Sequence, residues 1–192
     1  ESILVRVIRE QDPMVRESII TGTNNQTTVN AIQLYANDTF QIKLETYLET
    51  QGWYYERRRW QFRRTSKPAS RVRTILEVAQ AVIALQLLKP ETARARPRDT
   101  LRTSAGYKSV FSESSPLQFY SKSLDIMEAV ELYLRTPAAL LISDDATNDR
   151  YYLAAGSLLR ILDVSDLTTY DAMKSVALVA VPDEKLLNEI HL

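Results

Sequence analysis

The chain has 192 residues, of which 45% are hydrophobic and 25% are charged, as in folded domains and unlike disordered segments. It has no cysteine and one histidine, His191, which excludes disulfide frameworks, thiolate metal sites and histidine-rich metal centres and argues against a Ser-His-Asp triad. Its four glycines are too scattered for a phosphate-binding loop, and no apolar run approaches the ~20 residues of a membrane helix. We therefore expect no cofactor, no metal, no catalytic residue and no membrane contact.

The net charge of zero conceals two regions of opposite sign. Residues 1–112 contain 18 Lys and Arg against 11 Asp and Glu, a balance of +7, whereas residues 113–192 contain 6 against 13, a balance of −7. We therefore distinguish a basic region, 1–112, from an acidic helical region, 113–192. The acidic region is either a separate domain or the far wall of the same core.

The first third of the chain is where strands are expected. Alternating apolar residues over 3–8 predict a strand, and Asp12-Pro13 begins a helix, with Asp12 as its N-cap, that ends at Gly22. The polar stretch 23–28 predicts a loop, and a short helix over 30–35 follows it.

A longer helix is expected after Asn37-Asp38, with Asp38 and Gln41 forming a capping box. Its apolar residues share one face, and Gly52 ends it; they are Phe40, Leu44, Tyr47 and Leu48. The aromatic segment 53–57 then predicts a strand. We expect the strands of this third to belong to a sheet whose remainder precedes Glu1.

Helices dominate the rest of the prediction. The strongest helical pattern runs over 71–88, and the polar segment 91–115 is expected to be irregular, anchored by Tyr107, Val110 and Phe111. Four further helical stretches follow. The first carries the stripe Tyr120, Leu124, Met127, Val130 and Leu134, the second the stripe Tyr152, Ala155, Leu158, Leu159 and Leu162, and the last two cover 169–180 and the residues after Pro182. The predicted fold class is α+β and mostly α-helical, with short strands in the first third and a helical second half.

A dense run of arginines lies between positions 57 and 73, with no acidic residue among them and with Trp60 and Phe62 interleaved. Guanidinium groups bind phosphate oxygens, and aromatic rings stack on bases. We therefore predict that DNA or RNA binds at Arg57, Arg58, Arg59, Arg63, Arg64, Arg71 and Arg73. The alternative is that these arginines pair with carboxylates of the acidic region or form a solvated face. A second basic cluster lies at 94–102.

Three segments, taken in order and with their spacing, carry a resemblance to a known family. They are Val5-Arg6-Val7-Ile8, then Thr23-Asn24-Asn25-Gln26-Thr27-Thr28-Val29, then Asn37-Asp38 followed by Gly52-Trp53-Tyr54-Tyr55-Glu56-Arg57-Arg58. They resemble the AIPR family, the abortive infection phage resistance proteins of bacteria, over Leu4–Phe111. The chain departs from the family pattern in having Trp60 and Phe62 where a glycine is expected. It also lacks the upstream "NGxQT" motif and the nuclease-like amino-terminal region, so we expect it to be the carboxy-terminal part of a longer protein.

The resemblance implies a cytoplasmic antiviral defence protein that is part of a larger nuclease-like polypeptide. Together with the arginine run and the opposite charges of the two regions, this gives the expected partners: DNA or RNA, the missing amino-terminal region of the same protein, and a second copy of the chain. The alternative function is a protein-protein interaction or oligomerisation module with no nucleic-acid contact, in which the basic and acidic regions meet.

A candidate pocket follows from the same motifs. Amide side chains can read base edges, so Asn24, Asn25 and Gln26 form a candidate pocket that Tyr55 and Glu56 would extend. The alternative is that the amides satisfy backbone groups within a loop. Strand alternation puts Trp53 and Tyr55 on one face and Tyr54 and Glu56 on the other.

Other polar groups suggest no chemistry. Pro182-Asp183-Glu184-Lys185 lies at a helix start without the acid-x-lysine that a metal-dependent nuclease needs, and Asp144, Asp145 and Asp149 are expected in a solvated turn. His191 is expected to be a frayed terminal residue.

Overall fold

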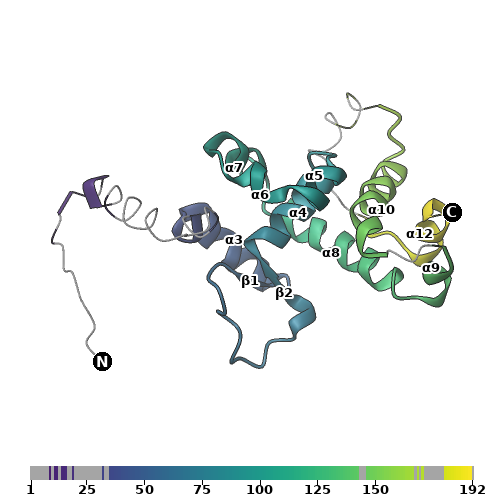
Figure 1. Cartoon of the computed structure of the whole chain (residues 1–192), viewed down its shortest axis with the longest axis horizontal. Coiled ribbons are helices and arrows are strands. Elements are labelled where there is room, and N and C mark those ends of the chain that lie inside the picture. Colours follow the sequence, from purple (N-terminus) through teal and green to yellow (C-terminus); the bar gives the residue numbers. More distant parts are fainter. Residues whose placement is uncertain are drawn as a thin grey trace.

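The computed structural model of the protein describes residues 35–142, 146–166 and 180–191, together with positions 9, 11, 12, 14–16, 19, 32, 168 and 170. In this part of the chain helices predominate and two short strands form one small sheet, which confirms the predicted α+β, mostly α-helical class (Figure 1). Asp12 Oδ1 accepts the Met14 amide at 2.8 Å, as expected of an N-cap. The strand expected over 3–8 and the loop over 23–28 lie outside the described residues.

The first well-described helix begins and ends as its sequence predicts, but Gln41 does not cap it. The elements here are η1 (Tyr35–Asn37), α3 (Thr39–Thr50) and β1 (Tyr54–Glu56). Asp38 caps α3 by accepting the Phe40 amide, and Gly52, with φ 80°, closes its far end. The predicted capping box is wrong, because the Gln41 side chain is buried and bonds to two tyrosines instead.

The two strands pair in parallel, and this arrangement produces the most prominent loop of the described structure. After β1 come η2 (Ala69–Arg71) and β2 (Val72–Thr74), with Tyr55 opposite Arg73. Parallel neighbours require the chain to travel back along the sheet before the second strand begins. Residues 57–68 make this return as a loop that extends away from the helices (Figure 1).

The helix predicted over 71–88 is shorter than expected. Residues 72–74 pair with β1 as β2, and α4 (Ile75–Leu85) begins only after them. A true capping box sets this start, because Thr74 and Glu77 exchange side-chain and backbone hydrogen bonds. The long-range pairing of β2 thus overrides the helical pattern of its own residues.

The segment predicted as irregular over 91–115 contains three short helices, so that prediction is wrong. They are α5 (Pro90–Ala95), α6 (Pro97–Leu101) and α7 (Ser104–Val110). Pro90 and Pro97 each open a helix at a position where a missing N–H costs nothing, and Thr103 caps α7 by accepting the Gly106 amide. The predicted anchors Tyr107, Val110 and Phe111 are buried, as expected.

The acidic region adds α8 (Gln118–Tyr133), α9 (Pro137–Ile142), α10 (Ala146–Ile161) and α12 (Glu184–His191). The predicted apolar stripe of α8 is buried throughout. On α10 the prediction fails at Tyr152, which is 43% exposed, whereas its neighbour Tyr151 is buried. Among the described helices, none is both long and apolar enough to cross a bilayer.

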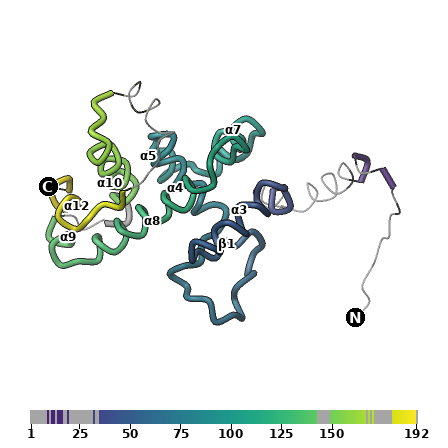
Figure 2. Tube along the Cα trace, turned by 180° about the vertical axis from the view of Figure 1, so that it is seen from behind, coloured from purple at the N-terminus to yellow at the C-terminus, as the bar shows by residue number. Residues whose placement is uncertain are grey.

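Helix α4 joins the basic and acidic regions. It packs against α5 of the basic region and against α8 and α10 of the acidic region, and Figure 2 shows these four helices grouped together. Val82 and Leu85 of α4, Leu124 of α8 and Leu158 of α10 belong to one cluster of buried apolar residues. We propose that residues 1–112 and 113–192 form one folding unit.

A chain that ends at residue 112 tests this proposal. Truncation would expose the faces of α4 that now contact α8 and α10, and we expect the fragment to lose cooperative unfolding in urea and most of its helical circular dichroism. A fragment that unfolds cooperatively, with the helicity of α3 and α4 retained, would show that the two regions are separate domains.

Candidate nucleic-acid interface

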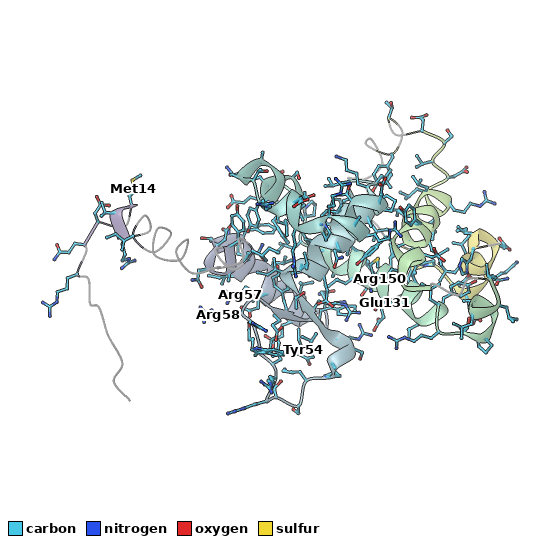
Figure 3. The ribbon with its side chains drawn as sticks, in the orientation of Figure 1. Met14, Tyr54, Arg57, Arg58, Glu131 and Arg150 are labelled. Atoms are coloured by element: carbon cyan, nitrogen blue, oxygen red, sulfur yellow. The ribbon has the colours of Figure 1, made fainter. Side chains whose placement is uncertain are left out.

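Part of the arginine run is engaged within the protein, beginning with Arg57. Its Nε and Nη2 atoms lie 2.7 and 2.6 Å from Glu45 Oε2, and its Nη1 donates to the Ala36 carbonyl. The neighbouring Arg58 donates to Asn37 Oδ1 at 3.0 Å. The end of β1 is thereby attached to the segment that precedes α3, and Figure 3 shows Arg57 and Arg58 together at this junction.

Two more arginines of the run bind an acidic stripe on α8, formed by Asp125, Glu128 and Glu131. Arg71 Nη2 lies 3.1 Å from Glu128, and Arg73 Nη2 lies 3.0 Å from Glu131. The spacing of three residues puts the acids of the stripe on one face of α8. These two arginines therefore do pair with the acidic region, as the alternative interpretation of the run predicted.

Trp53 lies at the centre of this contact and is fully buried. Its indole N–H donates to Asp125 at 3.0 Å, and the Arg71 and Arg73 guanidinium carbons lie 4.6 and 4.9 Å from its ring centroid. Glu131 also contacts Arg150 of α10 at 3.7 Å, and Figure 3 shows the two side chains side by side. The sheet, α8 and α10 are thus connected through one stripe of carboxylates.

The other arginines lie on the exposed part of the return loop, residues 58–67, which we call the basic loop. Arg59, Arg63 and Arg64 are exposed, and among the described residues none of them has an ion-pair partner. Trp60 is 57% exposed, and the Arg59 and Arg63 guanidinium carbons lie 5.1 and 5.0 Å from its ring centroid. The basic loop therefore presents cations and an aromatic ring to solvent.

Specific contacts hold the basic loop to the fold. Gln61 Oε1 accepts the Arg57 and Arg58 amides at 3.1 and 3.3 Å, and its Nε2 donates to Glu45 Oε1 at 2.6 Å. The Phe62 ring packs against Tyr54, with a centroid separation of 6.0 Å. Lys67 lies 4.0 Å from the Tyr54 ring centroid and 3.6 Å from Glu49. The exposed arginines are thus carried by an anchored backbone.

Only part of the candidate pocket lies within the described residues. Asn24, Asn25 and Gln26 lie outside the described residues. Tyr55 is 1% exposed on the buried face of β1, as the predicted alternation requires, and its hydroxyl donates to Gln41 Oε1. Glu56, on the other face, is half-buried and accepts the Phe62 amide at 3.4 Å.

A buried hydrogen-bonded chain explains why Tyr55 turns inward. Gln41 Nε2 donates to the Tyr107 hydroxyl at 2.8 Å, and that hydroxyl donates to Asp38 Oδ2 at 2.8 Å. Tyr35 stacks on Tyr107 with a centroid separation of 3.7 Å. The helix cap Asp38 and the strand residue Tyr55 are therefore linked through Gln41, a residue whose role short-range patterns did not reveal.

Burial raises the pKa of three tyrosines that belong to this hydrogen-bonded network or lie beside it. Desolvation puts the pKa of Tyr55 and of Tyr107 well above the ordinary 10.0, and it raises the pKa of Tyr120 to about 12. Each of these hydroxyls donates a hydrogen bond, and ionisation would remove that donor.

The prediction that His191 is a frayed terminal residue is wrong, because its side chain contacts two other helices. The Tyr133 hydroxyl lies 3.3 Å from its Nδ1, and Asp149 Oδ2 lies 3.7 Å from its Nε2. These contacts attach the end of α12 to α8 and α10. No group of three or more acidic or histidine side chains suited to a metal ion occurs within the described ranges.

The buried tyrosines predict a loss of stability at alkaline pH. In the unfolded chain these hydroxyls ionise near pH 10, whereas in the native state they keep their protons, so the free energy of unfolding should fall as pH rises from about 10 toward 12. Each tyrosine contributes a slope of about 1.4 kcal/mol per pH unit in that window. Urea unfolding at pH 8, 10 and 11 measures this fall, and Tyr120→Phe should reduce it. A constant free energy of unfolding up to pH 11 would contradict the raised pKa values of these tyrosines.

Comparison with known proteins places the chain in a family. A family model described as AIPR protein matches residues 1–153. No curated protein and no solved structure matches the chain. The matched range extends past Phe111, where the motif resemblance ended, and it includes both the arginine run and the acidic stripe of α8. The chain therefore belongs to the AIPR family, a membership that associates it with abortive infection and phage resistance.

Proposed function

We propose that this chain is the nucleic-acid-binding part of an abortive infection defence protein. The basic loop would hold DNA or RNA for the nuclease-like region that the family resemblance implies elsewhere in the polypeptide, in the cytoplasm of a bacterium. The observation that carries the proposal is the exposed, unneutralised charge of Arg59, Arg63 and Arg64 on an anchored loop.

The described structure gives the charges of Arg59, Arg63 and Arg64 no ion-pair partner, although Glu56 contacts the loop backbone. Between positions 57 and 73 the chain has no acidic residue, and the adjacent carboxylates Glu45 and Glu49 already contact Arg57, Gln61 and Lys67. Cations that are exposed, clustered and unpaired release counterions from nucleic acid at little cost in protein stability. Whether Arg57, Arg71 and Arg73 also contact a ligand stays a prediction, since their guanidinium groups already have protein partners.

The second basic cluster is a weaker candidate. Arg94, Arg96 and Arg98 are exposed on and between α5 and α6, but Glu91 and Asp99 flank them, and Asp99 also pairs with Arg102 at 3.6 Å. Its local charge is therefore partly neutralised. This cluster provides a control of equal size for experiments on the basic loop.

The alternative function, an oligomerisation module, has one observation in its favour. Leu132 of α8 and Leu140 and Leu141 of α9 are exposed large apolar side chains. A second copy of the chain would remove them from water. In that case salt and leucine substitutions would change the oligomeric state, and nucleic acid would have no effect.

Reversing the charge of the basic loop tests the proposed function. The variant Arg59→Glu/Arg63→Glu/Arg64→Glu should lose most of the affinity of the chain for a labelled oligonucleotide at low salt, and its salt dependence should fall by about three counterions. Its thermal midpoint should change little, because in the described part of the chain Arg59 and Arg63 contact the exposed Trp60 ring and no carboxylate. Fluorescence anisotropy and a thermal melt measure both quantities.

The matched control is Arg94→Glu/Arg96→Glu/Arg98→Glu, which changes the net charge by the same amount. It should retain most of the affinity. Equal loss in both triple variants would show that only total charge matters. A wild-type chain that binds no oligonucleotide at low salt, and instead changes its oligomeric state with salt, would favour the alternative function.

A further inference from the structure

Trp60 has a backbone conformation that is unusual for its residue type. Its φ is 67°, in the left-handed region, where a non-glycine residue pays about 1–2 kcal/mol. The Gln61 amide donates to the Arg58 carbonyl at 3.1 Å, so Trp60 occupies the third position of a four-residue turn. Turns of this kind normally place glycine or asparagine where φ is positive.

The contacts of the neighbouring residues leave the indole ring in solvent. Gln61 bonds to Glu45 and Phe62 packs against Tyr54, so the fold holds both residues that follow Trp60. The ring itself is 57% exposed, whereas the other tryptophan of the chain, Trp53, is fully buried. A largely exposed indole in a costly conformation gains little burial in the folded chain, which points to a ligand.

The surroundings of the ring indicate the chemistry of that ligand. Two guanidinium groups, from Arg59 and Arg63, lie within about 5 Å of the ring centroid, and Arg64 is exposed beside them. A flat apolar face beside several phosphate-binding cations suits a base and its neighbouring phosphates. When the base stacks, a displaced guanidinium can move to a phosphate without leaving the site.

We propose that Trp60 stacks on an unpaired base, so that the basic loop selects single-stranded nucleic acid. This inference rests on the proposed function. In a duplex both faces of every internal base are covered, so the ring has no partner there without unstacking the helix. The loop is also neither a helix nor a β-ribbon, the elements that fit the major groove.

An anionic membrane is the competing partner for an exposed tryptophan among arginines. The basic loop offers little apolar surface to insert, because its other large apolar side chain, Phe62, packs against Tyr54. Single-stranded nucleic acid is therefore the ligand that the contacts favour, and vesicles form one arm of the test.

The test compares three probes with about the same number of phosphates: a 20-nucleotide oligo-dT, an abasic 20-mer and a G·C-rich duplex of about 10 base pairs. The wild-type chain should bind oligo-dT most tightly, with quenching of tryptophan emission. Trp60→Ala should lower the affinity for oligo-dT about tenfold and change the affinities for the abasic strand and the duplex by less than twofold. Trp60→Phe should keep part of the preference, and Leu141→Ala, another exposed apolar position, should change nothing.

The variant Trp60→Gly distinguishes an effect on ligand binding from an effect on the stability of the fold. Glycine removes the ring and relieves the positive φ, so the thermal midpoint should stay equal or rise while the preference for oligo-dT disappears. Equal binding of all three probes by the wild-type chain, with no effect of Trp60→Ala, would overturn the inference and leave the proposed function intact. Binding of phosphatidylserine vesicles without any oligonucleotide binding would overturn both.

Discussion

The contact between Trp53, its two arginines and the acidic stripe of α8 holds the described structure together. Arg71 and Arg73 lie against the indole and reach Glu128 and Glu131, while the indole N–H reaches Asp125. A largely buried cation is stabilised when a carboxylate and a polarisable surface accompany it. Here Trp53 supplies the surface, and the carboxylates come from a helix more than fifty residues further along the chain. The opposite charges of the two regions thus have a structural cause.

This contact also determines what the remaining arginines can do. It fixes β2 beside β1 in parallel, and the parallel register forces residues 57–68 to return outside the helical body. Arg57 at the start of that return, and Arg71 and Arg73 after its end, contact carboxylates, whereas Arg59, Arg63 and Arg64 within it form no ion pair with a described residue. One run of like residues is thereby divided into internal ion pairs and an exposed cationic surface.

Short-range sequence patterns correctly predicted the elements that are determined by neighbouring residues. Asp38 and Gly52 delimit α3, and the apolar periods of α3 and α8 identified their buried faces. The predictions failed where distant partners decide. Gln41 fits a capping box but bonds to Tyr107, 66 positions away, and residues 72–74 continue a helical pattern but pair with β1. Likewise, the sequence alone could not show which arginines form ion pairs. The acids Asp125, Glu128 and Glu131 become their partners only because α8 packs against the sheet.

A crossed comparison of two single substitutions tests this division most directly. Arg73→Gln should lower the free energy of unfolding by about 2 kcal/mol, because it removes the nearest cation from the carboxylate of Glu131 and one of the two guanidinium groups that contact Trp53, and it should leave oligonucleotide affinity unchanged. Arg63→Gln should do the reverse, weakening binding at unchanged stability. Loss of binding at unchanged stability in Arg73→Gln, or loss of stability in Arg63→Gln, would contradict the division of the arginine run into structural and binding residues.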